Sequence, residues 1–216
     1  MKENSLASFV YGEIRKKILA NQLTGGSRLA ENTWATKLEV SRVAVREALI
    51  RLSGEGLVEF GEKGGCFVRS ITTEDVKEIR ELREVLELGA LKLLFRNRNK
   101  EVIKELEQIC ADFSSMVERG YHSGACEADV KFHETLIKGA GNVRLMNIYT
   151  NSNIPLFHFK LSSSGHVNDY SETDNEHRRI VECLKNNDLE AASQTLLQHL
   201  NRGEKLMLEM VPLESL

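Results

Sequence analysis

Apolar residues recur at three- and four-residue steps over most of the chain, which is the period of a helix face packed against a core. In the N-terminal third this pattern predicts helices over residues 6–20, 31–38 and 41–53. Two short apolar runs, Leu57–Phe60 and Cys66–Val68, flank a glycine-rich turn and predict a β-hairpin. Helices followed by such a hairpin are typical of a winged helix-turn-helix domain.

The rest of the chain has a helical period throughout. Six stripes face inward: Val76 to Leu93, Val102 to Met116, Asp129 to Ala140, Leu145 to Leu156, His177 to Leu184, and Leu189 to His199. They predict an antiparallel all-α bundle and a mainly α fold class. We assign residues 1–70 to the winged domain, 71–74 to a linker in which Thr72 or Thr73 caps the next helix, and 75–216 to the helical domain.

The amino-acid composition is consistent with two globular domains. The 216 residues are 41% hydrophobic and 28% charged, as in ordinary globular proteins. Because no apolar run approaches the ~20 residues of a membrane span and the start lacks an apolar secretion segment, we expect a cytoplasmic protein without a membrane partner. The four cysteines are scattered, so we expect free thiols.

Charge is distributed unevenly between the two predicted domains. Residues 1–70 hold 11 Lys and Arg against 8 Asp and Glu, a net charge of +3, whereas the remainder holds 18 against 24, a net charge of −6. A basic N-terminal domain favours a polyanionic partner, although an excess of three is also common on inert surfaces.

The predicted third helix carries features of a DNA-reading helix. Arg42 and Arg46 lie four residues apart near its start, on one face, where arginine can bind guanine in the major groove. Ser41 is placed to cap this helix and contact phosphate, and Lys63 with Gly64 forms a wing tip suited to the duplex backbone. The alternative is a solvated charged face with no ligand.

The bundle has an unusual set of inward polar residues. Asp129 and His133 lie one helical turn apart on an apolar face, while His177 and His199 lie on the inward stripes of two later helices. One divalent cation, zinc or nickel by preference, would satisfy all four groups. Alternatively, each histidine is an ordinary core residue and Asp129 pairs with His133 alone.

Two further residues are candidates for binding an effector. Arg83 lies on the inward stripe of the first bundle helix and could hold the acid group of a small organic acid, or else form an internal salt bridge. Asn153, one turn after Tyr149, is a second candidate.

The run Leu38–Leu49, followed by Glu55-Gly56-Leu57-Val58, resembles the signature of GntR-family transcription regulators. The resemblance implies that Arg42 and Arg46 contact an operator, with Ser41 and the wing loop beside them. This sequence departs from the family pattern at Glu39, which replaces the usual turn glycine.

The helical part resembles the FCD ligand-binding domain of the FadR subfamily, in its six-helix, VanR-like subgroup. The resemblance is carried by Arg83–Glu87, Asp129–His133, Gly139–Asn142, Glu176–Ile180 and Gln198–Leu200. Many such domains bind a metal through one Asp and three His, and the motifs carry that role onto Asp129, His133, His177 and His199.

Three hypotheses follow for function. The first is a homodimeric regulator, expected to be a repressor, whose affinity for a palindromic operator changes when a small carboxylate binds at the metal. In the second the metal ion itself is the signal. The third is a metal-dependent enzyme with a DNA-binding head, which we disfavour because the sequence has no H-E-x-x-H, G-x-S-x-G or P-loop motif.

Overall fold

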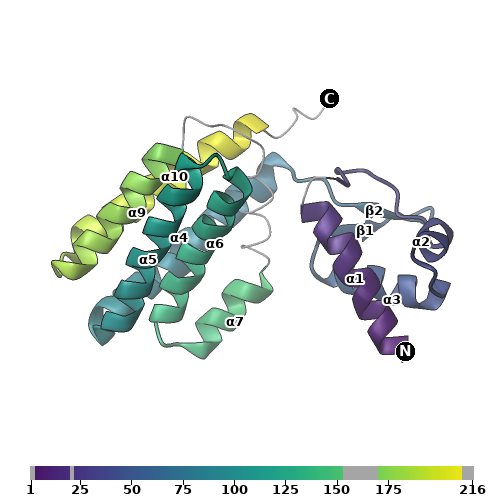
Figure 1. Cartoon of the computed structure of the whole chain (residues 1–216), viewed down its shortest axis with the longest axis horizontal. Coiled ribbons are helices and arrows are strands. Elements are labelled where there is room, and N and C mark those ends of the chain that lie inside the picture. Colours follow the sequence, from purple (N-terminus) through teal and green to yellow (C-terminus); the bar gives the residue numbers. More distant parts are fainter. Residues whose placement is uncertain (1–2, 20–21, 153–169, 211–216) are drawn as a thin grey trace. The chain divides into compact units, whose positions relative to one another are not determined.

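The computed structural model of the chain describes residues 3–19, 22–152 and 170–210 (Figure 1). The chain divides into two compact units, Met1–Ile71 and Thr72–Leu216, which we describe separately. The first helix of the second unit begins at Thr73, within the range that we assigned to the linker. None of the helices in the described ranges combines the length and apolar character that crossing a membrane requires.

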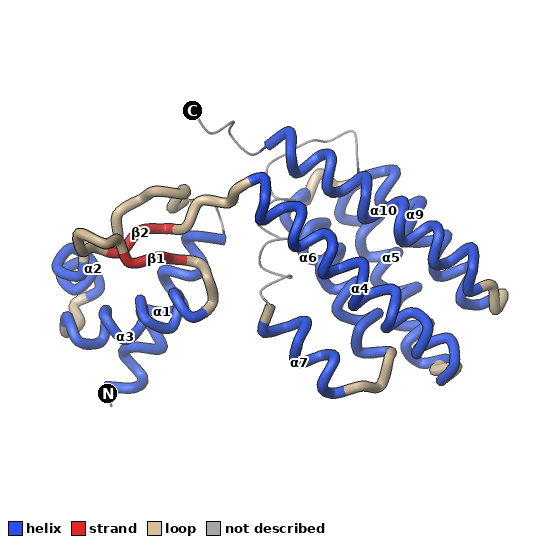
Figure 2. Tube along the Cα trace, turned by 180° about the vertical axis from the view of Figure 1, so that it is seen from behind, coloured by secondary structure: helices blue, strands red, loops and turns tan. Residues whose placement is uncertain are grey.

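The N-terminal unit is a winged helix-turn-helix, as predicted. Its elements are α1 (Glu3–Leu19), α2 (Glu31–Leu38), α3 (Arg42–Gly54), β1 (Val58–Phe60) and β2 (Cys66–Val68). The two strands are antiparallel (Figure 2), and an isolated bridge pairs Arg28 with Phe67 of β2. The apolar faces of α1 and α3 pack together and bury the N-terminal core, which includes Val10, Ile14, Ile18, Val45, Leu49 and Leu52.

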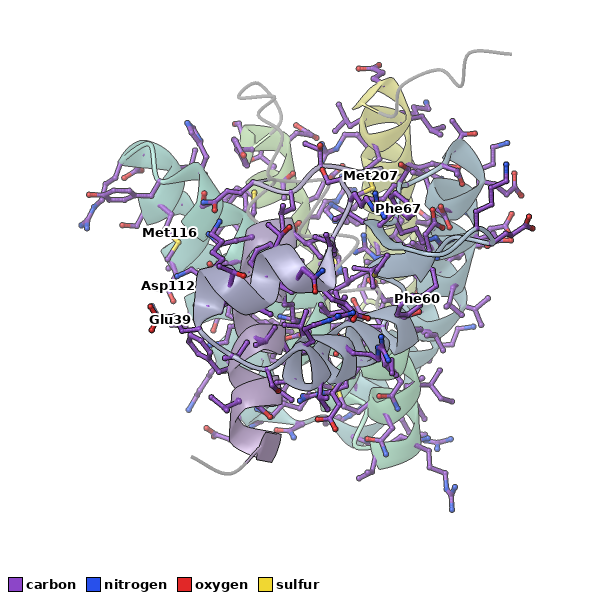
Figure 3. The ribbon with its side chains drawn as sticks, turned by 90° about the vertical axis from the view of Figure 1, so that its right-hand side faces the viewer. Glu39, Phe60, Phe67, Asp112, Met116 and Met207 are labelled. Carbon is purple, nitrogen blue, oxygen red and sulfur yellow. The ribbon has the colours of Figure 1, made fainter. Side chains whose placement is uncertain are left out.

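The turn between α2 and α3 contains an unusual backbone conformation. Glu39 ends α2 with φ 54°, in the left-handed region that favours glycine. Two residues later Ser41 caps the start of α3, and its hydroxyl accepts a hydrogen bond from the backbone N–H of Ala44 at 3.1 Å. The chain therefore changes direction between α2 and α3 at Glu39, which is labelled in Figure 3.

The second unit is all-α within the described ranges. Its helices are α4 (Thr73–Asn97), α5 (Lys100–Glu118), α6 (His122–Gly139), α7 (Val143–Asn151), α9 (Tyr170–Lys185) and α10 (Leu189–Met210). Helices α4, α5, α6, α9 and α10 lie side by side as a bundle, and α7 packs against α6 and α4 (Figures 1 and 2). The predicted kink at Pro155 lies outside the described residues.

Helix α4 begins with a capping box. The Thr72 hydroxyl accepts from the backbone N–H of Asp75 at 3.1 Å, and the Asp75 carboxylate accepts from the backbone N–H of Thr72 at 2.9 Å. Inside the bundle, Leu91, Leu106, Phe113, Phe132 and Leu196 belong to one apolar cluster contributed by five helices. This core fixes the faces of α6, α9 and α10, and so fixes which of their polar side chains point inward.

Candidate functional site

Four polar side chains converge inside the bundle. Asp129 and His133 come from α6, His177 from α9 and His199 from α10, and all four are buried. Each offers one ligand atom, and these atoms lie within 4.8 Å of one another. The structure therefore brings together the four residues that the sequence nominated as metal ligands.

The atoms of these four side chains that face the centre of the cluster lie close to one another. Nε2 of His133 lies 3.1 Å from Nε2 of His199, and Nε2 of His177 lies 3.2 Å from Oδ1 of Asp129. Oδ1 of Asp129 is also 3.7 Å from Nε2 of His133. Three imidazole nitrogens and one carboxylate oxygen thus share a small volume.

Two buried glutamates hold the outer nitrogens of the facing rings. Oε2 of Glu87 lies 2.7 Å from Nδ1 of His133, and Oε2 of Glu176 lies 2.8 Å from Nδ1 of His199. Because an ionised carboxylate only accepts hydrogen bonds, Nδ1 is the donor in each ring. In a neutral ring the Nε2 lone pair then points toward the centre, which is the arrangement that outer carboxylates impose on metal-binding histidines.

The charges of the two glutamates support this assignment. Burial alone would raise the pKa of Glu87, but Arg83 and His133 together lower it well below its ordinary value. Burial acts in the same direction on Glu176, yet hydrogen bonds from His199 and Arg202 lower its pKa to about 2. Both side chains are therefore ionised acceptors at neutral pH.

The histidines differ in their tendency to take a proton. Burial lowers the pKa of His177, and it lowers the pKa of His199 to about 3. Burial also opposes protonation of His133, but the adjacent Glu87 carboxylate outweighs it and raises the pKa of that ring. His177 and His199 are accordingly neutral at physiological pH, in the form that binds a metal.

These observations test whether the residues fit a cation. Two Nε2 lone pairs facing each other at 3.1 Å repel unless a positive charge lies between them. A divalent ion supplies that charge and also suits the carboxylate of Asp129 and the imidazole of His177. The donor set and its outer carboxylates fit a metal, whereas a proton on Nε2 of His133 would satisfy only the His133–His199 contact.

Arg83 lies beside this cluster, on α4. Its Nε donates to Oε1 of Glu87 at 2.7 Å, so the internal salt bridge that we considered as an alternative is present. Within the described part of the chain, its buried Nη2 has no hydrogen-bond partner. Tyr149 of α7 donates to the same Glu87 oxygen at 3.4 Å. Asn153, the other effector candidate, lies outside the described residues.

Glu87 and Glu176 were not among the residues nominated from the sequence. Glu87 lies four residues after Arg83 on one face of α4, and Glu176 immediately precedes His177. The Arg83 spacing was a usable signal for Glu87, since oppositely charged residues at this separation commonly pair. No local signal connects Glu176 of α9 with His199 of α10.

The nominated DNA-binding residues lie on the surface of the N-terminal unit. Arg42 and Arg46 project from the first two turns of α3, with 63% and 62% of their side chains exposed. Ser41 caps this helix, and Lys63 and Gly64 are exposed in the loop between β1 and β2. A further residue that we did not nominate, Glu31 at the start of α2, forms ion pairs with both arginines.

Comparison with known proteins extends these findings. Residues 6–68 match the bacterial regulatory proteins of the gntR family, and residues 78–202 match the FCD domain. The chain is 32% identical over 197 residues to the HTH-type transcriptional regulator YdhC of Bacillus subtilis (strain 168), covering 88% of this chain and 86% of that protein. It is 26% identical over 192 residues to the gluconate operon transcriptional repressor of the same strain, covering 87% and 79% respectively.

Solved structures share the fold. E. coli McbR/YncC superposes with a TM-score of 0.76 at 19% sequence identity, over 95% of this chain and 98% of that chain. The family matches and the similarity to YdhC together establish the class of protein. The chain belongs to the gntR family of bacterial regulatory proteins, carries an FCD domain, and is a DNA-binding transcription regulator rather than an enzyme.

Proposed function

We propose that the protein is a homodimeric repressor of a palindromic operator, controlled by a small carboxylate that binds at a metal ion in the helical unit. Asp129, His133, His177 and His199 would hold the ion, with zinc or nickel preferred. Two relatives that are named repressors support the direction of regulation: the gluconate operon transcriptional repressor of B. subtilis and the transcriptional repressor RspR of E. coli, the latter 24% identical.

One observation carries this proposal: four ligand atoms from three helices lie within 4.8 Å of one another in a buried site. Removing that many polar groups from water is unfavourable unless each finds a partner. Glu87 and Glu176 already satisfy the outer nitrogens of His133 and His199. The inward atoms contact one another and form a preformed set of donors for a cation.

Residues beside the cluster favour an anionic effector. When bound, the ion would supply a positive charge and open coordination positions, because zinc and nickel can take more than four ligands. Arg83 adds a second positive charge, and its Nη2 is available for a carboxylate oxygen. A small organic acid offers negatively charged oxygens to both groups, whereas a neutral or cationic metabolite brings no negative charge to either.

Effector binding would act on DNA through the dimer. A ligand shifts the equilibrium between two arrangements of a dimer only to the extent that it binds one arrangement more tightly than the other. The two arrangements would space the paired α3 helices differently, and a palindrome with half-sites about 34 Å apart would accept one spacing and not the other. The exposed arginines of α3 are the groups that this spacing would align with DNA.

The test uses the metal-loaded wild-type chain, a panel of small mono- and dicarboxylates, and the duplex that the protein selects from a randomised pool. At least one carboxylate should raise the thermal midpoint and change affinity for the selected duplex, and Arg83→Lys should weaken both responses. If DNA affinity follows metal concentration and no carboxylate changes it, the ion itself is the signal and the effector proposal is wrong.

A further inference from the structure

Glu31 lies between the two exposed arginines of the candidate DNA-binding helix. Its carboxylate accepts two hydrogen bonds from Arg46, Nε to Oε1 at 2.8 Å and Nη2 to Oε2 at 3.1 Å. Nη2 of Arg42 is 3.5 Å from Oε2 of the same group. The pairing crosses the helix-turn-helix, from the first residue of α2 to the first two turns of α3.

The carboxylate is better shielded than the groups that it binds. Only 21% of the Glu31 side chain is exposed, against more than 60% for either arginine. Hydrogen bonding from Arg46 lowers the pKa of Glu31, so the group is ionised at neutral pH. Packing of α2 against α3 fixes its position. Glu31 is thus a fixed anion against which Arg46 is oriented.

The geometry of the Arg46 pair leaves one edge of the guanidinium available. Arginine has five N–H donors, and Glu31 occupies the edge formed by Nε and Nη2. The end formed by Nη1 and Nη2 stays outside this pair. That end is the fork that can bind O6 and N7 of guanine. The pair with Glu31 thus restrains an exposed side chain while leaving its Nη1–Nη2 end outside the pair, which lowers the entropy loss when that end binds a base.

Glu31 also changes the charge that the helix presents to DNA. Affinity for any duplex rises with each cation that contacts a phosphate, whatever the sequence. The bidentate pair cancels the charge of Arg46 locally and competes with phosphates for its donors. Arg42, held only by a single contact at 3.5 Å, keeps more freedom.

We propose that Glu31 is a specificity-determining positioning residue, whose carboxylate directs Arg46 toward bases and withholds it from the phosphate backbone. The inference rests on the proposed role of Arg42 and Arg46 in DNA binding. It assigns the two arginines different roles: Arg46 is held in place to contact bases, and Arg42 is a more mobile DNA contact.

The test replaces Glu31 with glutamine and measures affinity for two duplexes across a salt series. The probes are the duplex that the wild-type protein selects from a randomised pool and a scrambled duplex of equal length. Glu31→Gln should bind the scrambled duplex more tightly, and the ratio of the two affinities should fall about tenfold. The dependence of log affinity on log salt should steepen by up to about 0.9, as expected for one added phosphate contact.

Glu47→Gln is the matched control, because it removes the same charge from the residue after Arg46. Within the described ranges Glu47 forms no ion pair with either arginine, so this variant should keep the wild-type affinity ratio. A purely structural Glu31 would lower the melting temperature of the variant and leave the ratio unchanged, which overturns the inference.

Arg46→Ala separates this inference from the function on which it rests. If Arg46→Ala leaves binding to both duplexes unchanged, the proposed DNA-binding surface is wrong and the role of Glu31 falls with it. If Arg46→Ala weakens selected-duplex binding while Glu31→Gln keeps the wild-type ratio, only the role of Glu31 is wrong.

Discussion

Nε2 of His133 and Nε2 of His199 face each other at 3.1 Å, although the two residues are 66 positions apart in the sequence. In each ring Nδ1 is hydrogen-bonded to a glutamate carboxylate. Neither ring can therefore turn Nδ1 toward the centre of the cluster without losing that hydrogen bond. If both rings are neutral, their Nε2 lone pairs repel, and either a metal ion or a proton between the two nitrogens removes the repulsion. This pair of nitrogens is the main reason to propose a metal ion in the helical unit.

Chelation should destabilise the wild-type protein. An ion that binds only the folded bundle adds about 3–4 kcal/mol to the free energy of unfolding when its concentration is 100 to 1,000 times its dissociation constant. Adding a strong chelator should therefore lower the melting temperature of the wild type in differential scanning calorimetry. His133→Ala should melt lower and no longer respond to the chelator, whereas His122→Ala, on the same helix outside the cluster, should respond as the wild type does.

Glu87→Gln should weaken metal binding and stability together. The change removes the negative charge that accepts from Nδ1 of His133 and pairs with buried Arg83. Loss of such an outer partner typically lowers metal affinity 10- to 100-fold, and leaving a buried charge unpaired costs about 3–5 kcal/mol. Urea unfolding and metal titration would measure the two effects. Glu78→Gln, on an exposed position of the same helix, should change neither, and an unaltered Glu87→Gln protein would contradict the role assigned to this carboxylate.

Arg42→Ala should weaken operator binding about 10- to 100-fold and relax base preference at one position. The exposed side chain near the start of α3 is placed to contact DNA, and its ion pair with Glu31 is a single contact at 3.5 Å. Fluorescence anisotropy with the selected duplex and its single-base variants would show the loss. Lys16→Ala, which removes one exposed charge from α1, serves as the comparison. Equal affinity of Arg42→Ala and wild type across all duplexes would show that Arg42 does not contact DNA.

Glu39→Gly should stabilise the N-terminal unit by up to about 1 kcal/mol. Glu39 has φ 54°, and a residue with a Cβ is strained in this region whereas glycine is not. The gain is limited because glycine loses more backbone entropy on folding. Thermal unfolding of the full chain, followed by a probe in the N-terminal unit, measures the difference. A destabilised Glu39→Gly would show that the carboxylate makes a contribution larger than the strain.

The helical period was sufficient to predict much of this site from the sequence. Asp129 and His133 share the apolar face that carries Phe132, so burial of that face carried both polar groups inward. Ser41 was expected as one helix cap and Thr72 or Thr73 as another; Ser41 and Thr72 are the caps, and each side chain accepts from the backbone N–H three residues later. In each case the determining interactions lie within one or two turns of helix.

The site residues that the sequence did not indicate make their contacts with a different helix from their own. Glu176 binds His199 across 23 residues, and Glu31 binds Arg46 across 15. A glutamate on a helix is most often solvated, so its residue type alone gives no indication of such a partner. Register between neighbouring helices decides these contacts, and local periodicity does not specify it.

Elemental analysis of the purified, metal-reconstituted protein would show whether a divalent ion binds at Asp129, His133, His177 and His199. The account predicts about one divalent ion per wild-type chain, and loss of that ion from His177→Ala while the variant keeps its helical circular dichroism. A wild-type protein that takes up no divalent ion would show that a proton, rather than a metal, lies between His133 and His199. A His177→Ala protein with a full complement of metal would show that the ion binds elsewhere.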